Sequence, residues 1–460
     1  MLTKLIPLTL LILSALVGTS ASANPSTSRP NFIIILADDQ GYADLGCFGS
    51  ETIQTPQIDQ LAKEGRKFTS FYVPSPLCTP SRAGLLTGCY PKRLSIAKGV
   101  LFPKSSTGLH PDEVTIADML KTAGYATACV GKWHLGHREP FLPTKQGFDS
   151  YFGIPYSNDM NHPDNKNRPK ISSDDSWLNQ AESVKQWNAP LMRDGEIIEL
   201  PVNQRTITRR YTDEAIKFIQ ANQDQPFFLY LPHSMPHIPL FVPEDAYDPD
   251  PENAYKAVIE HMDAEVGRVV ETVKKLGLSE HTYIIYTSDN GPWLRFKNHA
   301  GSAEPLRDGK MSTYEGGQRV PCVMWAPGRI PAGTETAAMA STIDLFPTIA
   351  KLAGVETSPN GTIDGIDISD LIQGSDQARR NEFIYYSKKG VLEGLRQGDW
   401  KVRLTGGKQE LYNLEGDIGE QDNLAKSQPE RTSNLIERMN QLDAQLSTEI
   451  RPIGRVEEAL

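Results

Sequence analysis

The chain lacks long apolar runs. Its 460 residues contain one extended apolar stretch, 5–17, which is shorter than the roughly 20 residues needed to span a bilayer. Lys4 precedes this stretch and small residues follow it at 21–23, a pattern typical of a secretory signal peptide. We therefore expect residues 1–23 to be a signal peptide, with an uncleaved anchor as the alternative. The mature protein is expected to be exported, periplasmic or secreted, with no stable membrane insertion.

Excess positive charge is also missing. Lys and Arg total 47 against 57 Asp and Glu, which gives a formal net charge of −10. Such a protein is not drawn nonspecifically to nucleic acid, although a local basic pocket can still bind an anion. We therefore expect no nucleic-acid partner. With 39% hydrophobic residues and no internal repeat, the chain suits a large α/β domain and a smaller one.

Cysteine is scarce, and its spacing excludes a zinc site. None of the cysteines stands in the short pairs that hold zinc. An exported protein can keep disulfides, but the odd count leaves at least one cysteine unpaired. If one is reserved for chemistry, the others form at most two bridges or remain free thiols. The five residues are Cys47, Cys78, Cys89, Cys129 and Cys322.

Short apolar strands alternate with amphipathic helices over most of the chain, which predicts a mostly parallel sheet between layers of helices. After Gly374, short strands separated by Gly-containing turns predict a small antiparallel sheet with one helix on it. We therefore expect an α/β catalytic domain over 24–374 and an α+β subdomain over 375–460. The expected strands are 31–37, 126–130, 227–231, 282–287, 382–387, 392–396, 400–404 and 410–414, and the expected helices are 58–64, 81–87, 115–123, 255–276 and 429–446.

Acidic and amide side chains follow two of the predicted parallel strands. Asp38 and Asp39 come after the first, and Asp289 and Asn290 come after 282–287. The carboxyl ends of parallel strands meet at one edge of a sheet, where ligands bind. Oxygen ligands of this kind favour Ca²⁺ or Mg²⁺ over Zn²⁺. For Asp38 and Asp39 alone, a helix cap or a solvated turn is the alternative.

Residues 78–88 combine a thiol, a helix start and a fixed cation. Pro80 suits a first helical turn, so Cys78 is expected at a helix N-terminus, where free N–H groups favour an anion. Arg82 adds a positive charge. An ordinary thiol or a disulfide is the alternative. At another strand end, Lys132 and His134 offer a cation and an imidazole, unless they are surface residues.

Two motifs carry a family resemblance. Cys-x-Pro-Ser-Arg, followed by Leu-Thr-Gly, and the hexapeptide 131–136 resemble the two signatures of the type I sulfatases, members of the alkaline-phosphatase superfamily. The resemblance implies an alkaline-phosphatase-like fold and sulfate ester hydrolysis. It also implies that a maturation enzyme converts Cys78 to formylglycine, whose aldehyde hydrate supplies the attacking oxygen.

The same resemblance implies a role for each matching residue. The modified Cys78 and the strand-end residues Asp38, Asp39, Asp289 and Asn290 would hold one divalent cation, Ca²⁺ rather than Mg²⁺. Further roles are implied for groups that hold the sulfate or move protons: Arg82, Lys132 and Lys310 for charge, Ser157 for a hydrogen bond to sulfate, His134 as the base and His237 as the general acid, shared with Lys310. For Ser157, an ordinary turn hydroxyl is the alternative.

Two polar stretches, 158–200 and 292–309, are expected to form the pocket rim. Arg295 and His299 lie in the second stretch with Trp293 and are predicted substrate contacts, since an aromatic ring and cations suit a sulfated sugar, with a solvated loop as the alternative. The expected substrate is a sulfated saccharide or an aryl sulfate. Alternatives are a phosphonate or phosphate ester hydrolase of the same superfamily, and a noncatalytic protein that binds sulfated glycans with Cys78 unmodified.

Overall fold

The computed structural model describes residues 29–457 apart from 163–186, 358 and 378. The predicted signal peptide and part of the stretch 158–200 lie outside the described residues. No helix in the described part is long and apolar enough to cross a membrane.

An eleven-stranded sheet forms the centre of the molecule, in the order β11-β2-β10-β9-β1-β8-β4-β5-β6-β7, with β12 also paired to β2. The five consecutive strands from β9 to β5 are parallel, which confirms the mostly parallel sheet. The strands are β1 Asn31–Ala37, β2 Arg66–Tyr72, β4 Ala126–Val130, β5 Ser150–Gly153, β6 Leu191–Arg193, β7 Glu196–Glu199, β8 Phe227–Pro232, β9 Thr282–Ser288, β10 Arg319–Trp325, β11 Thr334–Thr336 and β12 Ala340–Ser341.

Strand β10 departs from the predicted parallel order. It runs antiparallel to both β9 and β2. The chain leaves β9 at the carboxyl edge, stays there through the loop that contains Lys310 and the short helix α7 (Glu315–Gln318), and enters β10 from the same edge. A parallel strand would need a crossover back to the opposite edge.

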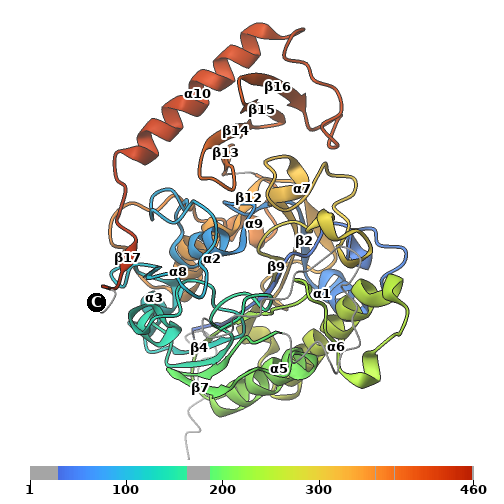
Figure 1. The fold of residues 1–460 in the computed structure, drawn as a ribbon, viewed down its shortest axis with the longest axis vertical. Helices are drawn as coiled ribbons and strands as arrows, with labels where there is room; N and C mark the ends of the chain where they lie inside the picture. Colours follow the sequence, from blue (N-terminus) through green and yellow to red (C-terminus); the bar gives the residue numbers. More distant parts are fainter. Residues whose placement is uncertain (1–28, 163–186, 358, 378, 458–460) are drawn as a thin grey trace, which may run out of the picture.

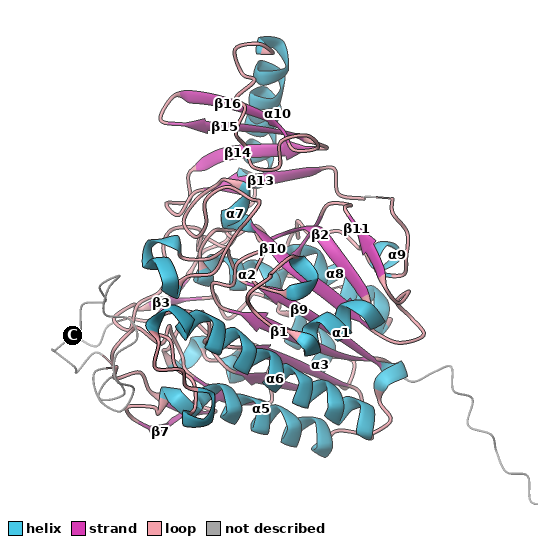
Figure 2. Ribbon diagram, turned by 90° about the vertical axis from the view of Figure 1, so that its right-hand side faces the viewer, coloured by secondary structure: helices cyan, strands magenta, loops and turns pink. Residues whose placement is uncertain are grey.

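Helices cover both faces of the sheet, and the two-residue period of β1 divides its side chains between two cores. Phe32, Ile34 and Leu36 pack in one core, and Ile33 and Ile35 pack in the other. Figure 2 shows α1, α5 and α6 lying together across one face. The helices of that face are α1 Pro56–Glu64, α5 Gln204–Ala221 and α6 Ala254–Lys275; those of the other are α2 Cys78–Thr87, α3 Ile116–Lys121, α8 Leu345–Ala353 and α9 Ser369–Ile372.

A second, four-stranded antiparallel sheet with the order β13-β14-β15-β16 lies beyond one edge of the main body (Figure 1). Helix α10 packs on it through Leu435, Met439 and Leu446. The chain then returns to the main body, where β17 (Gly454–Arg455) pairs with β3 (Thr107–Gly108), a contact that the sequence did not predict. The elements of this part are β13 Glu382–Tyr386, β14 Leu392–Gln397, β15 Trp400–Thr405, β16 Lys408–Asn413 and α10 Pro429–Ser447.

Buried Glu315 of α7 joins the two sheets. Its carboxylate accepts hydrogen bonds from Tyr72 on β2 at 2.5 Å, from Tyr385 on β13 at 2.8 Å and from Lys401 on β15 at 2.8 Å. Lys401 is fully buried and also pairs with Glu420 at 2.8 Å. Loss of one partner would leave buried charge without compensation, which is costly.

We predict that Lys401→Met destabilises the protein by about 3–5 kcal/mol, because the carboxylates of Glu315 and Glu420 lose their shared cation. The measurement is the free energy of unfolding from urea denaturation. Lys275→Met is the matched control: Lys275 pairs with Glu271 on the exposed face of α6, and its loss should cost less than about 1 kcal/mol. Equal effects of the two substitutions would contradict this role of Lys401.

Candidate active site

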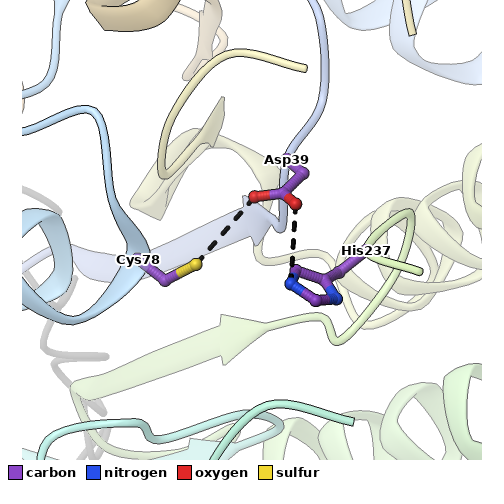
Figure 3. A group of neighbouring side chains, drawn as sticks. All are labelled: Asp39, Cys78 and His237. Carbon is purple, nitrogen blue, oxygen red and sulfur yellow. Dashed lines mark hydrogen bonds and ion pairs between the residues drawn. The ribbon is translucent and has the colours of Figure 1, made fainter. Parts of the chain in front are cut away.

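The candidate active site lies at the carboxyl edge of the central parallel strands. Asp38 and Asp39 follow β1, and Asp289 and Asn290 follow β9. Cys78 is the first residue of α2, as predicted, and its thiol points toward this edge. Figure 3 shows Cys78, Asp39 and His237 converging from three separate elements. Residues far apart in the sequence therefore meet at one point.

Four of these residues form a compact group of metal-ligating type. One ligand atom from each of Asp38, Asp39, Cys78 and Asp289 lies within 4.8 Å of all the others. The Cys78 Sγ is 3.5 Å from Asp38 Oδ1 and 3.9 Å from Asp39 Oδ1. Asn290 donates to Asp39 Oδ1 at 2.7 Å, while its own Oδ1 is buried without a hydrogen-bond partner among the described residues.

Three buried cations surround the carboxylates. Arg82 donates to Asp289 Oδ2 from Nε at 2.9 Å and to the Lys132 carbonyl at 2.6 Å. Lys132 Nζ contacts Asp38 Oδ2 at 2.5 Å, and Lys310 Nζ contacts Asp39 Oδ2 at 2.7 Å. Each carboxylate is therefore paired with a fixed positive charge inside the protein.

Burial and charge act in opposite directions on the carboxyl groups. Burial alone would raise the pKa of Asp38, but the charges of Lys132, His237 and Arg82 hold it below its usual range. Burial, and then the neighbouring Asp38 carboxylate, raise the pKa of Asp289 to about 7. The negative charges of Asp38 and Asp289 therefore disfavour each other even though three cations lie beside them.

Lys310 and Lys132 also reach beyond the carboxylates. Lys310 Nζ lies 3.5 Å from the Cys78 Sγ, and Lys132 Nζ donates to the Ser157 hydroxyl at 3.0 Å. The structure therefore brings both predicted sulfate-binding lysines, and Ser157, next to the group around Cys78. Burial raises the pKa of the Cys78 thiol well above its usual value, so an unmodified Cys78 stays a neutral thiol at pH 7.

His134 is a buried, neutral imidazole with one unengaged nitrogen. Burial, and then Lys132 and Arg82, lower its pKa well below the usual value. Nε2 lies 3.0 Å from the Leu101 carbonyl, which can only accept, so Nε2 carries the proton. Nδ1 is buried without a hydrogen-bond partner among the described residues. Its lone pair is free to take a proton.

Strained backbone orients the site. Asp39 and His134 adopt positive φ values of 69° and 61°, a conformation uncommon outside glycine. Gly131, which precedes Lys132, has φ 137°, and a Cβ there would lie 1.9 Å from the Pro232 carbonyl oxygen. A side chain at residue 131 would collide with the end of β8, so only glycine lets the ends of β4 and β8 lie this close together.

His237 follows β8 and lies beside Asp39 and Cys78. Its Nε2 is 3.6 Å from Asp39 Oδ2 and 3.4 Å from the Ser157 hydroxyl. Its Nδ1 donates to the Ile238 carbonyl at 2.5 Å. Burial, and then Lys310, lower the pKa of His237. The ring therefore presents Nε2 to the site.

Sequence reasoning does not identify the Thr79 hydroxyl or the Leu101 backbone as part of the site, and it places Trp293 only on the pocket rim. The Thr79 hydroxyl donates to the His134 carbonyl at 3.0 Å and accepts from the Leu101 backbone at 3.2 Å, so it links the two. Trp293 lies 4.4 Å from Lys310 Nζ, measured to the ring centroid, and its ring is 5.5 Å from the His237 ring. These contacts depend on loops that only the fold brings together.

The two predicted rim contacts lie apart from this group. Arg295 is exposed on the short helix η7 (Leu294–His299), whereas the His299 ring is buried and bonds to the Pro251 backbone. Neither side chain pairs with the residues around Cys78 in the part of the chain that is described. Their roles as substrate contacts stay predictions.

All five cysteines are free thiols in this structure.

Comparison with known proteins agrees with this geometry. A sulfatase family model matches residues 30–355, and the model "N-sulphoglucosamine sulphohydrolase, C-terminal" matches residues 308–448. The chain belongs to the sulfatase family. It is therefore a type I sulfatase of the alkaline-phosphatase superfamily, and its activity is the hydrolysis of sulfuric esters.

Several relatives match along most of their length. Arylsulfatase G of Rattus norvegicus is 36% identical over 91% of this chain and 87% of its own. N-acetylgalactosamine-6-sulfatase of Canis lupus familiaris is 36% identical over 85% of this chain and 74% of its own. The crystal structure of Ps i-CgsB in complex with k-i-k-neocarrahexaose superposes with a TM-score of 0.78 at 31% identity, covering 90% of this sulfatase and 93% of that chain.

Proposed function

We propose that this sulfatase is exported and removes sulfate from a sulfated carbohydrate, using a formylglycine made from Cys78 and one Ca²⁺. The observation that carries the proposal is the meeting of Cys78 with three carboxylates, with the ammonium of Lys310 and with the imidazole of His237. A maturation enzyme that acts on Cys78 is part of the proposal. Formylglycine would supply the attacking oxygen as its aldehyde hydrate.

The residues present fit a hard divalent cation. Asp38, Asp39, Asp289 and Asn290 offer only oxygen ligands, which calcium prefers. The buried Asn290 Oδ1 has no hydrogen-bond partner among the described residues, as expected of a ligand atom. Calcium bound here would stabilise negative charge on the oxygen of residue 78.

The charges of the site suit an anionic ester. Three carboxylates are balanced by Arg82, Lys132 and Lys310, so one divalent cation would leave the group positive by two charges. Lys310 lies beside residue 78 and Lys132 beside Ser157, and both lysines would bind the sulfuryl oxygens. Charge fixed in a buried site stabilises a transition state in which negative charge spreads over those oxygens.

The two histidines divide the proton transfers. His134 Nδ1 has a free lone pair, so His134 would act as the base that takes a proton from residue 78. His237 Nε2 faces Asp39 and would protonate the departing alcohol oxygen, with Lys310 beside it. A bound sulfate ester brings negative charge close to His237, which favours its protonated form.

Several observations support a carbohydrate substrate. Among the relatives, one is named for N-acetylgalactosamine 6-sulfate, and a similar structure holds a neocarrahexaose. Trp293 stands beside His237, where an aromatic ring would pack on the apolar face of a sugar. Arg295, exposed two residues after Trp293, would meet an anionic substituent of a larger saccharide. An aryl sulfate would be a simpler substrate of the same site.

We predict that paired aryl sulfate and aryl phosphate esters separate this proposal from a phosphate or phosphonate ester hydrolase. The value of kcat/KM should favour the sulfate ester by about 100-fold or more, equivalent to about 2.7 kcal/mol. Cys78→Ala is the control, since it removes the precursor of the attacking group and should abolish turnover. A strong preference for phosphate would overturn the assignment, and binding of sulfated glycans without turnover would favour a binding protein.

Removal of the metal tests the oxygen-ligand site. The purified protein should hold one Ca²⁺ per chain by elemental analysis, and chelation should abolish activity until Ca²⁺ is returned. Asn290→Ala should raise the Ca²⁺ concentration for half-maximal recovery by roughly 10- to 100-fold, because one ligand is lost. Full activity in protein free of divalent cations would contradict the proposal.

A further inference from the structure

The orientation of the His237 ring depends on the backbone that follows it. Nδ1 donates to the Ile238 carbonyl at 2.5 Å, so this peptide group determines where Nε2 points. The ring is almost completely buried, and Nε2 contacts Ser157 and Asp39 at 3.4 Å and 3.6 Å. A shift of the peptide at Ile238 would therefore turn Nε2 away from the position of the leaving oxygen.

The side chain of Asn158 holds the peptide groups on both sides of that carbonyl. Its Nδ2 lies 3.1 Å from the Pro239 carbonyl oxygen and 3.4 Å from the His237 carbonyl oxygen, which share one of its two hydrogens because the other goes to Gln204. Asn158 is fully buried, so water does not compete for these bonds. Three successive carbonyls, at His237, Ile238 and Pro239, are thus held by Asn158 or by the imidazole itself.

Gln204 in turn orients Asn158. Gln204 is the first residue of α5 and is buried. Its Oε1 accepts from Asn158 Nδ2 at 3.0 Å, and its Nε2 donates to the Asn158 carbonyl at 2.9 Å. This reciprocal pair fixes the amide so that its donor side faces the carbonyls after His237. The start of α5 is thereby connected to the ring.

We propose that Asn158, oriented by Gln204, is a positioning residue for proton transfer by His237. Asn158 touches neither the thiol nor the lysines, and it acts only through the backbone of residues 237–239. Its neighbour Ser157 contacts both Lys132 and His237, so consecutive residues align the sulfate-binding lysine and the imidazole. The inference rests on the proposed function, in which His237 protonates the leaving oxygen.

Sulfate esters with different leaving groups test this role. Protonation matters least for 4-nitrophenyl sulfate, whose phenolate leaves readily, and most for alkyl or sugar sulfates. For Asn158→Ala we expect kcat to fall less than about 3-fold with 4-nitrophenyl sulfate and about 10- to 100-fold with the poor leaving groups, with little change in KM. A uniform loss across the series would overturn the proposal.

Matched variants separate positioning from loss of structure. Asn31→Ala removes another buried amide at the opposite end of β1, where it bonds to Thr282 and Phe227, and should leave the leaving-group dependence unchanged. Gln204→Met keeps the side-chain volume and removes both bonds to Asn158, so it should shift kcat in the same direction by a smaller factor. If Asn158→Ala does not fold, the test rests on Gln204→Met. A leaving-group dependence in Gln204→Met equal to that of the wild type would then overturn the proposal.

A double substitution tests whether Asn158 acts through His237. In a His237→Ala background, Asn158→Ala should cause no further loss with phenyl sulfate, because the group it positions is absent. The same fold loss in both backgrounds would overturn the proposal. Wild-type enzyme that releases no sulfate from any ester would instead reject the proposed function, a result visible before any variant is compared.

Discussion

The arrangement of the site depends on one electrostatic constraint: three buried carboxylates must share a small volume at the carboxyl edge of the sheet. Isolated buried charges are costly, and Arg82, Lys132 and Lys310 each pair with one of the carboxylates. These cations come from α2, from the turn after β4 and from the loop between β9 and β10. The requirement for charge balance therefore binds distant segments together and leaves Cys78 between acids and lysines.

The same constraint accounts for the features that surround the site. Strained backbone at Asp39 and His134 is tolerated because neighbouring contacts hold both residues in place. The second sheet is attached through another buried charge, Glu315, which lies five residues after Lys310. The loop that contains Lys310 is thus held at one end by the central sheet and at the other by Lys401 of the second sheet.

Much of the fold and of the candidate site was predictable from the sequence, because the patterns that indicate strands and strand-end residues are local. Apolar runs such as 31–37 and 282–287 form buried strands, and polar residues directly after them lie at the ligand-binding edge. What could not be predicted depends on contacts between distant segments. Three examples are the antiparallel direction of β10, the contact of the Leu101 carbonyl with His134, and the contact of the Asn158 amide with the His237 backbone. They depend on the paths of the loops at the carboxyl edge of the sheet, which residue types alone do not indicate.

The central claim is that Cys78 is a precursor and that its modified form does the chemistry. The most direct measurement is the intact mass of the peptide that contains residue 78, taken from enzyme preparations of known turnover. Conversion of the thiol to an aldehyde lowers the mass by about 18 Da, and the account predicts that sulfate release scales with the converted fraction. Full turnover by a preparation in which residue 78 is entirely cysteine would contradict it.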